Sequence, residues 1–319
     1  MRARAGLDER RGLAAAAARS GVDRVRRRGP WLQAAVRFRR RPLGIVALLV
    51  TMAFVVIAVF APRLAPYTGA QLFFRFINDP QPPSLHGGHL LGTDVLGHDM
   101  LTQMLWAVRE TVLGALGCAL AATLIGLAVG AVGGYFGGAL DSAVQWLTSL
   151  VVIIPALVVL LMVVAFEAPL PLWAFPATLA LYLWIHVARA VRGSFITLRH
   201  REFIEASLAA GASGRWIVFR HLLPNAVGTL LVAGTAVVGQ STVIIATATF
   251  FGYGNQQTDR PTLGGLLSNA ASGTQFAISP FASTPWWLWV LPAVTLGLFI
   301  VAIYFLADTL DEVLQPVRA

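Results

Sequence analysis

Apolar runs alternate with polar segments along the chain. Six such runs lie at residues 44–60, 111–133, 143–166, 172–188, 226–250 and 286–306. Each approaches the roughly 20 residues that an α-helix needs to cross the hydrocarbon core of a bilayer. The first run could also be a secretory signal peptide, but it is longer than the apolar region of about 7 to 15 residues that is usual there. The pattern predicts an all-α, polytopic membrane protein with six transmembrane helices and both termini on the same side.

The composition supports a membrane location and orients the chain. Hydrophobic residues make up 57% of the sequence and charged residues 12%, with a mean hydropathy of +0.71, whereas soluble domains carry about 25% charged residues. The net charge of +9 comes from arginine alone, and 13 of the 24 arginines lie in residues 1–41, against three acidic residues. A basic arm can bind nucleic acid, but beside a hydrophobic segment it is more typical of a cytoplasmic segment that attracts anionic lipid. We therefore expect a cytoplasmic N-terminus in contact with membrane lipid and not with nucleic acid.

The loops carry charge as this topology requires. Residues 189–225 hold six arginines, whereas 61–107 and 251–285 hold few, and cytoplasmic loops are enriched in Lys and Arg. Both termini are therefore expected in the cytoplasm. The expected organisation is a basic cytoplasmic arm (1–43), a first transmembrane helix (44–60), an extracytoplasmic loop (61–107), a five-helix core (108–306) with a cytoplasmic loop at 199–225 and an extracytoplasmic segment at 251–285, and a cytoplasmic tail (307–319).

Several kinds of activity are excluded by residues that the sequence lacks. A Walker A loop needs Gly-Lys-Ser/Thr, and the chain has no lysine, so ATP must be bound by another polypeptide. The hydrolase motifs Gly-x-Ser-x-Gly and His-Glu-x-x-His are also absent. Cys118 is the single cysteine, which rules out an intrachain disulfide or a thiolate metal site. The apolar runs hold almost no ionisable residue, which argues against a proton-coupled carrier. The chain is predicted not to be an enzyme.

Two features inside the predicted helices concern packing. Gly126, Gly130 and Gly134 recur every four residues in the second helix, and small side chains at this spacing allow helices to approach closely in lipid. Helix packing is therefore expected for all three. In the fifth helix, residues 239–242 form a polar patch, Gly-Gln-Ser-Thr. This patch could line a pathway or bond a neighbouring helix, and packing is the favoured interpretation.

A polar, glycine-broken stretch at residues 202–225 separates two apolar runs. The segment from Arg199 to Ala210 has a helix-forming composition, and Gly211 can adopt the positive φ that ends a helix. Ser213 is placed to cap a second short helix up to Leu223, and Pro224 either stops that helix or begins the next membrane helix. We therefore predict a compact knob of two short helices.

This stretch resembles the EAA loop of ABC importer permeases. Glu205, Ala206, Gly211, Ile217, Leu223 and Pro224 fill the pattern, and Ser207 stands where the family prefers Ala. The resemblance implies that the knob docks, helix in groove, on a cytoplasmic ATPase subunit, and that Glu205 holds the knob through an ion pair with Arg201 or Arg220. The candidate coupling residues are Arg201, Glu205, Ala206, Ser207, Gly211, Arg215, Ile217, Arg220, Leu223 and Pro224.

A second resemblance lies in the first extracytoplasmic loop. Residues 91–99 are similar to the Leu-Gly-Thr-Asp-x-x-Gly-Arg-Asp signature of the C-type permeases of dipeptide, oligopeptide and nickel importers, with His98 in place of the usual Arg. Residues 248–254 and 308–316 are similar to two further segments of that family. A transition-metal site could be drawn in this loop, but the signature already explains its two aspartates, so no metal site is predicted. The signature residues are Gly92, Thr93, Asp94, Gly97 and Asp99, and the alternative metal set is His86, His89, Asp94, His98 and Asp99.

Together these resemblances imply the permease fold of type I ABC importers in a bacterial cell membrane. The expected function is ATP-driven import of di- or oligopeptides. The implied partners are a homologous B-type permease, two ATPase subunits and an extracytoplasmic substrate-binding protein. No cofactor is expected in this chain, with ATP and Mg²⁺ on the partner subunits. A nickel or other metal importer of the same family stays open, and so do two rivals of other classes, an ATPase-independent channel and a structural membrane scaffold.

Overall fold

The computed structural model describes residues 30–67, 80–85, 88–159, 162, 174–252, 261–272 and 285–314. Helices dominate this part of the chain, and its only strand-like contact is an isolated bridge between Thr93 and Asp99. The elements are α2 (Pro30–Arg39), α3 (Pro42–Leu64), α4 (Met100–Phe136), α5 (Gly138–Ile153), α7 (Ala174–Arg199), α8 (Glu202–Ala209), α9 (Gly214–Ile217), the π-helix η2 (Val218–Leu222), α10 (Leu223–Phe250), α11 (Leu263–Ser272) and α12 (Trp286–Leu314).

Each of the six predicted apolar runs overlaps one of the long helices α3, α4, α5, α7, α10 and α12. By length and composition, four stretches could span a membrane: Pro42–Leu64, Met100–Phe136, Gly214–Phe250 and Trp286–Leu314. The predicted boundaries were too narrow for α4, because Asp99 caps that helix and its first residue, Met100, lies 11 residues before the apolar run begins. The third run was predicted as one helix over 143–166, but α5 ends at Ile153. Pro155 follows, and a proline disfavours helical backbone at the residue before it.

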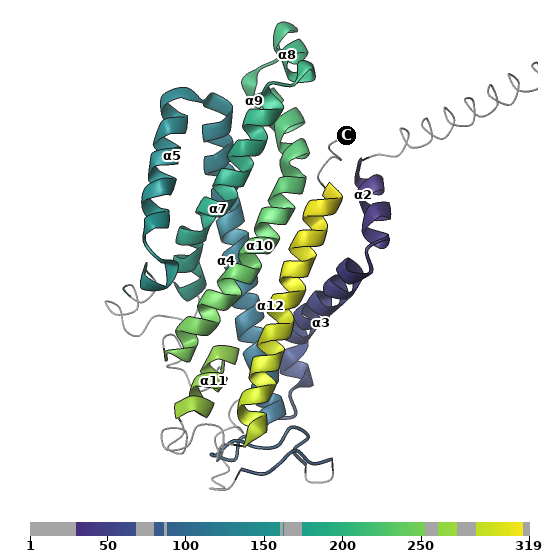
Figure 1. Cartoon of the computed structure of the whole chain (residues 1–319), viewed down its shortest axis with the longest axis vertical. Helices are drawn as coiled ribbons and strands as arrows, with labels where there is room; N and C mark the ends of the chain where they lie inside the picture. Colours follow the sequence, from purple (N-terminus) through teal and green to yellow (C-terminus); the bar gives the residue numbers. More distant parts are fainter. Residues whose placement is uncertain are drawn as a thin grey trace, which may run out of the picture.

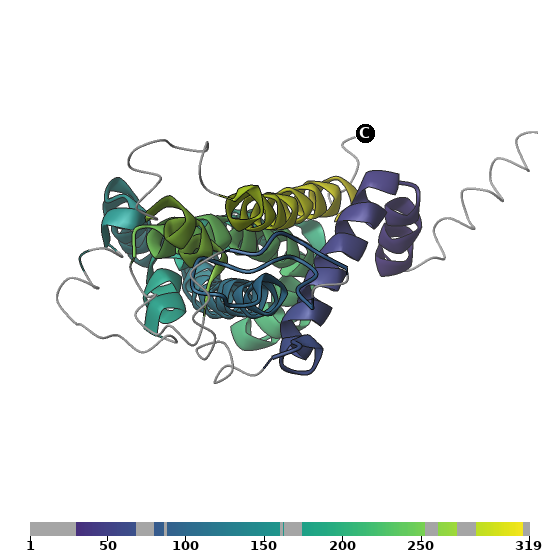
Figure 2. The same cartoon turned by 90° about the horizontal axis from the view of Figure 1, so that it is seen from below.

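The long helices lie side by side (Figure 1). The α8–α9 region lies at one end of the molecule, and α2 and the last turn of α12 point toward that same end, whereas α11 and the loop before α4 lie at the other. Seen along the bundle (Figure 2), α5 and α3 occupy opposite edges. Most of the basic arm, residues 1–29, lies outside the described residues, and α2 follows it as a short helix.

The centre of the bundle is the contact between α4 and α7. An ideal Cβ added at Gly126 would lie 2.6 Å from the Trp184 carbonyl oxygen, and one at Gly134 would lie 2.7 Å from Phe195 Cβ. A Cβ at Gly130 would overlap the carbonyl of Ala188. From Gly126 to Gly134, the α7 residues that the glycines meet increase in residue number. The two helices therefore run parallel and in close contact. Only glycine leaves room for this approach.

A proline inside α3 determines how α3 is joined to α4. Pro62 has no N–H, so the Ala58 carbonyl four residues earlier loses its helical donor. The Arg109 guanidinium of α4 donates to that carbonyl at 2.8 Å and to Val59 O at 3.2 Å. Arg109 therefore replaces a missing backbone hydrogen bond with one between helices.

Candidate functional site

The predicted knob has the two halves that its sequence indicates. Gly211, two residues after the end of α8, has a positive φ of +81°. The Gly211 N–H donates to Leu208 O at 2.9 Å, and the Ala212 N–H donates to Ser207 O at 3.0 Å. These two bonds form a Schellman motif, which satisfies the last carbonyls of a helix. The positive φ predicted for Gly211 is confirmed.

The second half of the knob begins at the predicted cap. Ser213 Oγ accepts from the Trp216 N–H at 3.4 Å and starts α9. The expected end at Leu223 is wrong, because α9 continues through η2 into α10 without a break. Pro224, in the first turn of α10, begins the membrane helix. A π-helical turn accommodates the missing proline N–H, and the Asn225 side-chain amide donates to the carbonyl of His221 at 2.6 Å.

The knob has a small core and an exposed aromatic surface. Ile204, Ile217 and Leu222 are at most 1% exposed. In contrast, large apolar side chains face outward, and two of them stack on one histidine: the rings of Trp216 and His221 lie 4.8 Å apart, and those of Phe203 and His221 lie 5.9 Å apart. The outward set, which we call the aromatic surface of the knob, is Phe203, Leu208, Trp216 and Phe219, with exposed fractions of 44%, 49%, 49% and 67%.

Most of the predicted coupling residues are exposed, like the aromatic surface. Seven are exposed, namely Arg201, Glu205, Ala206, Gly211, Arg215, Arg220 and Pro224, while Ser207 and Leu223 are half-buried and Ile217 is buried. The ion pair predicted for Glu205 is wrong, since Glu205 approaches neither Arg201 nor Arg220 within 4 Å among the described residues. An exposed carboxylate gains little from pairing in water, and it stays accessible to another chain. The aromatic surface itself was missed by the sequence reasoning, although aromatic residues in so polar a stretch could have indicated it.

The knob is joined to the ends of two long helices. Gly214, the first residue of α9, lies so close to the Tyr135 hydroxyl of α4 that an added Cβ would overlap it. Arg199, the last residue of α7, donates from Nη1 to Tyr135 O at 2.7 Å. Because α4 and α7 are the most closely packed pair in the bundle, a displacement of the knob acts on both together.

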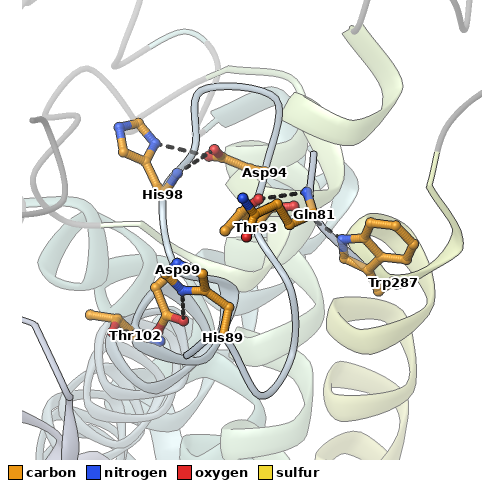
Figure 3. Close-up of polar contacts among 8 residues, drawn as sticks. All are labelled: Gln81, His89, Thr93, Asp94, His98, Asp99, Thr102 and Trp287. Atoms are coloured by element: carbon orange, nitrogen blue, oxygen red, sulfur yellow. Dashed lines mark hydrogen bonds and ion pairs between the residues drawn. The ribbon is translucent and has the colours of Figure 1, made fainter. Parts of the chain in front are cut away.

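The signature residues of the loop predicted to be extracytoplasmic form a folded loop that caps α4 (Figure 3). This loop lies at the end of the molecule opposite the knob (Figure 1). Asp99 Oδ2 accepts from the Thr102 N–H at 2.8 Å and from the Thr102 hydroxyl at 2.7 Å. Asp99 Oδ1 lies 3.0 Å from His89 Nδ1, and both side chains are buried. Asp99 is thus the N-cap of α4 and an anchor for the preceding turn.

A second carboxylate organises the turn at 94–98. Asp94 accepts from the backbone N–H groups of Leu96 and His98 at 2.9 and 2.8 Å, and from Gln103 Nε2 at 2.8 Å. His98 Nδ1 lies 2.9 Å from Asp94 Oδ2, so the substituted histidine keeps a contact at this position. Burial raises the pKa of Asp94, but the hydrogen bonds and charge of His98, with the bond from Gln103, outweigh burial and hold the pKa below its ordinary value.

Thr93 fastens the same loop to the rest of the molecule. Its N–H donates to the Gln81 carbonyl at 3.0 Å, and its hydroxyl oxygen accepts from the Gln81 N–H at 2.8 Å. Its carbonyl accepts from Trp287 Nε1 of α12 at 3.0 Å. Gly92 has φ +79°, and an added Cβ would lie 2.6 Å from Gln81 O. The signature residues therefore build a rigid loop that joins α4 to α12.

The alternative metal set does not come together in the part of the chain that the structure describes. His89 pairs with Asp99 and His98 with Asp94, as two separate contacts. No three His, Cys, Asp or Glu side chains among the described residues are close enough to hold a metal ion. His86 lies outside the described residues.

Comparison with known proteins assigns the family. Residues 122–318, more than half of the chain, match the family described as binding-protein-dependent transport system inner membrane component. The chain belongs to this family. Residues 29–83 also match the N-terminal TM domain of oligopeptide transport permease C. The predicted resemblance is confirmed, and the chain is a multi-pass membrane permease component of an ABC importer.

Curated relatives align with this permease over most of its length. The oligopeptide transport system permease protein OppC of Mycobacterium tuberculosis is 31% identical over 282 residues, which cover 88% of this chain and 92% of the relative. OppC of Haemophilus influenzae is 28% identical, with 91% and 89% covered. The glutathione transport system permease protein GsiD of Pectobacterium atrosepticum is also 28% identical, with 91% and 92% covered.

A solved structure has the same fold. A chain of the MetNI methionine ABC transporter, in inward facing conformations, matches 68% of this permease and is itself covered to 98%, with a TM-score of 0.51 and 22% identity. The likeness extends to the fold alone, and the predicted all-α permease fold is confirmed.

Proposed function

We propose that this permease carries di- or oligopeptides into the cytoplasm of a bacterial cell, driven by ATP hydrolysis on separate subunits. Its relatives named OppC and GsiD are permeases for oligopeptides and glutathione, which supports a peptide as the substrate. Both termini would then be cytoplasmic, in line with the excess of arginine in residues 1–41 and 189–225.

The aromatic surface of the knob is the main support for coupling between this permease and an ATPase subunit. Four large apolar side chains on α8, α9 and η2 are exposed to 44–67%. Such a group is costly in water and typical of a buried interface. The knob's own core and its joints to Tyr135 and Arg199 make it stiff, so motion of a docked partner would reach α4 and α7. An ATPase subunit that closes on ATP would supply that motion.

The other subunits of the proposed importer are those that the family implies. Without lysine, this chain has no Walker A loop, so ATP and Mg²⁺ would be bound by two ATPase subunits. A homologous B-type permease would complete the pathway, and an extracytoplasmic binding protein would deliver the peptide. This chain would hold no cofactor.

Affinity purification of the tagged permease from its native membrane in mild detergent tests this assembly. A second permease and Walker-bearing ATPases are expected to copurify with the wild type. The ATPases should be lost from a Glu205→Arg, Gly211→Pro variant while the second permease is kept. A wild-type permease that purifies alone would favour the channel alternative, and a variant that retains its ATPases would overturn the coupling assignment.

A further inference from the structure

One face of α10 carries side chains of unusual chemistry for a membrane helix. Ala236, Gln240, Val243 and Thr247 follow at spacings of four, three and four residues, so they share a face. All four are partly or fully exposed, whereas Val238, Thr242 and Ile245 on the opposite side are buried. In Figure 1, α10 lies between α7 and α12. This face is the part of α10 that those helices leave uncovered among the described residues.

The outward face of α10 differs from the outward faces of α3 and α12. The exposed side chains of those two helices are large and apolar, as lipid contact requires: Leu43, Val46, Leu49, Met52, Val56 and Val59 on α3, and Val294, Leu298, Val301 and Phe305 on α12. The face of α10 instead presents the Gln240 amide and the Thr247 hydroxyl beside one alanine and one valine. Polar groups in hydrocarbon are costly unless they are bonded. We infer that something other than lipid meets this face.

Gln240 is the group that needs a partner. It lies 17 residues after Leu223 and 10 before Phe250, or about 15 Å from the nearer helix end, and thus near the middle of the span. The Thr247 hydroxyl is bonded to Val243 O at 2.8 Å, and the buried Ser241 hydroxyl is bonded to Val238 O at 3.0 Å. The Gln240 amide has no hydrogen bond within the described part of the chain. Packing therefore explains Ser241, but it leaves Gln240 unexplained.

A second polar group, on α12, lies beside Gly239, the residue before Gln240. An ideal Cβ on the adjacent Gly239 would be 3.2 Å from Tyr304 Cζ of α12, so the phenol lies over this turn of α10. Tyr304 is 44% exposed, and its hydroxyl, like the Gln240 amide, has no hydrogen bond to the residues described here. An amide and a phenol can each donate and accept. The Gln240 amide and the Tyr304 hydroxyl thus lie at about the same level of the bundle, and neither has a hydrogen bond among the described residues.

We propose that Gln240 and Tyr304 bind the main chain of the peptide as it crosses the membrane. Peptide N–H and C=O groups need acceptors and donors whatever the side chains are, which suits a permease for peptides of varied sequence. Gln240 is longer than its neighbours Ala236, Val243 and Thr247, so it projects from the face; close helix contact in lipid is instead made by small residues. This inference rests on the proposed function, and it adds a substrate contact to it.

Cysteine accessibility in the assembled importer tests whether water and peptide reach Gln240. The native Cys118 is fully buried and would be replaced by Ala. In this background Gln240→Cys is compared with Leu49→Cys, on the apolar face of α3, and with Ser241→Cys, which is buried. Membrane vesicles that hold all subunits are treated with a charged methanethiosulfonate, and label is measured on the tagged permease alone. Labelling of Gln240→Cys but not of the two controls is expected, with peptide, binding protein and ATP slowing it about tenfold or more.

Other results of the labelling and uptake measurements would overturn either the peptide contact or the proposed function. If Gln240→Cys stays as unreactive as Leu49→Cys or Ser241→Cys, lipid or the partner permease covers the face and the inference is wrong. Labelling that peptide does not slow, in vesicles that still take up peptide, also overturns the contact. Vesicles of the wild type that take up no peptide contradict the proposed function itself, and uptake is therefore measured first.

Substitutions that keep the packing separate a contact from a structural role. Tyr304→Phe retains the ring over Gly239 and removes only the hydroxyl, and Gln240→Leu removes only the amide. Both variants are expected to copurify with their partners at the wild-type level and to slow peptide uptake, Gln240→Leu by about tenfold. Wild-type uptake in both variants would overturn the proposal.

Discussion

The bond between Arg109 and the Ala58 carbonyl should be worth a measurable part of the stability of the permease. Arg109→Ala removes the donor that Pro62 made necessary and leaves a carbonyl without a partner at a residue that is 0% exposed. A hydrogen bond to a charged group contributes about 1.5 to 3 kcal/mol, and an orphaned buried acceptor costs about 1 to 3 kcal/mol. We therefore expect a loss of about 2 kcal/mol in the free energy of unfolding. At about 2 to 4 °C per kcal/mol for chains of 150 to 250 residues, Tm should fall by about 4 to 8 °C.

A double-mutant cycle isolates this bond. Pro62→Ala returns an N–H to α3 that can bond to the Ala58 carbonyl, so Arg109 becomes less necessary. Arg109→Ala should then cost about 1 to 2 kcal/mol less in the Pro62→Ala background than in the wild type. The measurement is Tm of the four purified proteins in the same detergent.

Arg63→Ala is a matched control for the loss of an arginine beside an aromatic ring. The Arg63 guanidinium lies 5.8 Å from the centre of the Phe60 ring, as that of Arg109 lies 6.0 Å from Trp106. The Arg63→Ala variant should therefore show the effect of losing the charge and the ring contact alone. Its Tm should be close to that of the wild type. An equal loss for Arg63→Ala, or the same loss for Arg109→Ala in both backgrounds, would refute the reasoning.

Two further predictions concern the packing of α4 and the loop that caps it. Gly126→Val should lower Tm or prevent folding, because a Cβ there lies 2.6 Å from a backbone oxygen of α7, whereas Gly117→Val, with nothing within 4 Å, should cost only the small helix-propensity difference; equal losses would contradict the contact. Because the folded-state pKa of Asp94 is below its ordinary value of 3.8, its contribution to stability is complete above that value and is lost as pH falls through the lower, folded pKa. The loop should accordingly become more sensitive to acid-stable proteases as pH falls below about 4, and Asp94→Asn should flatten that dependence; an unchanged profile in Asp94→Asn would assign the acid response to another group.

Local chemistry allowed the helical parts of the knob to be predicted. The end of α8 depends on a glycine with positive φ and the start of α9 on a serine cap, and both are decided within a few residues. The apolar runs likewise indicated the long helices. Their ends were less accurate, since Asp99 extends α4 beyond its apolar part and Pro155 follows a break at Ile154 that ends α5 early.

The sequence pattern could not predict contacts between residues that are far apart in the chain. Trp287 bonds to Thr93 across 194 residues, and Arg109 reaches Ala58 across 51. Glu205 was expected to pair within the knob, but an exposed side chain can adopt many rotamers and no local pattern selects one. The sequence pattern favoured packing for the whole polar patch at 239–242. The structure shows that Ser241 is buried and Gln240 is partly exposed, so the two residues differ in their surroundings.

Peptide uptake by a Gly211→Pro variant tests the central claim most directly. Proline fixes φ near −65°, whereas Gly211 has φ +81° and a Cβ added there would have nothing within 4 Å beyond its chain neighbours. The change is therefore expected to break the turn of the knob without disturbing the bundle. Gly211→Asn, which tolerates positive φ, is the control. In proteoliposomes that hold the whole complex, we expect Gly211→Pro to insert normally and to lose ATP-dependent uptake, while Gly211→Asn retains most of it. Full uptake by Gly211→Pro would contradict coupling through the knob.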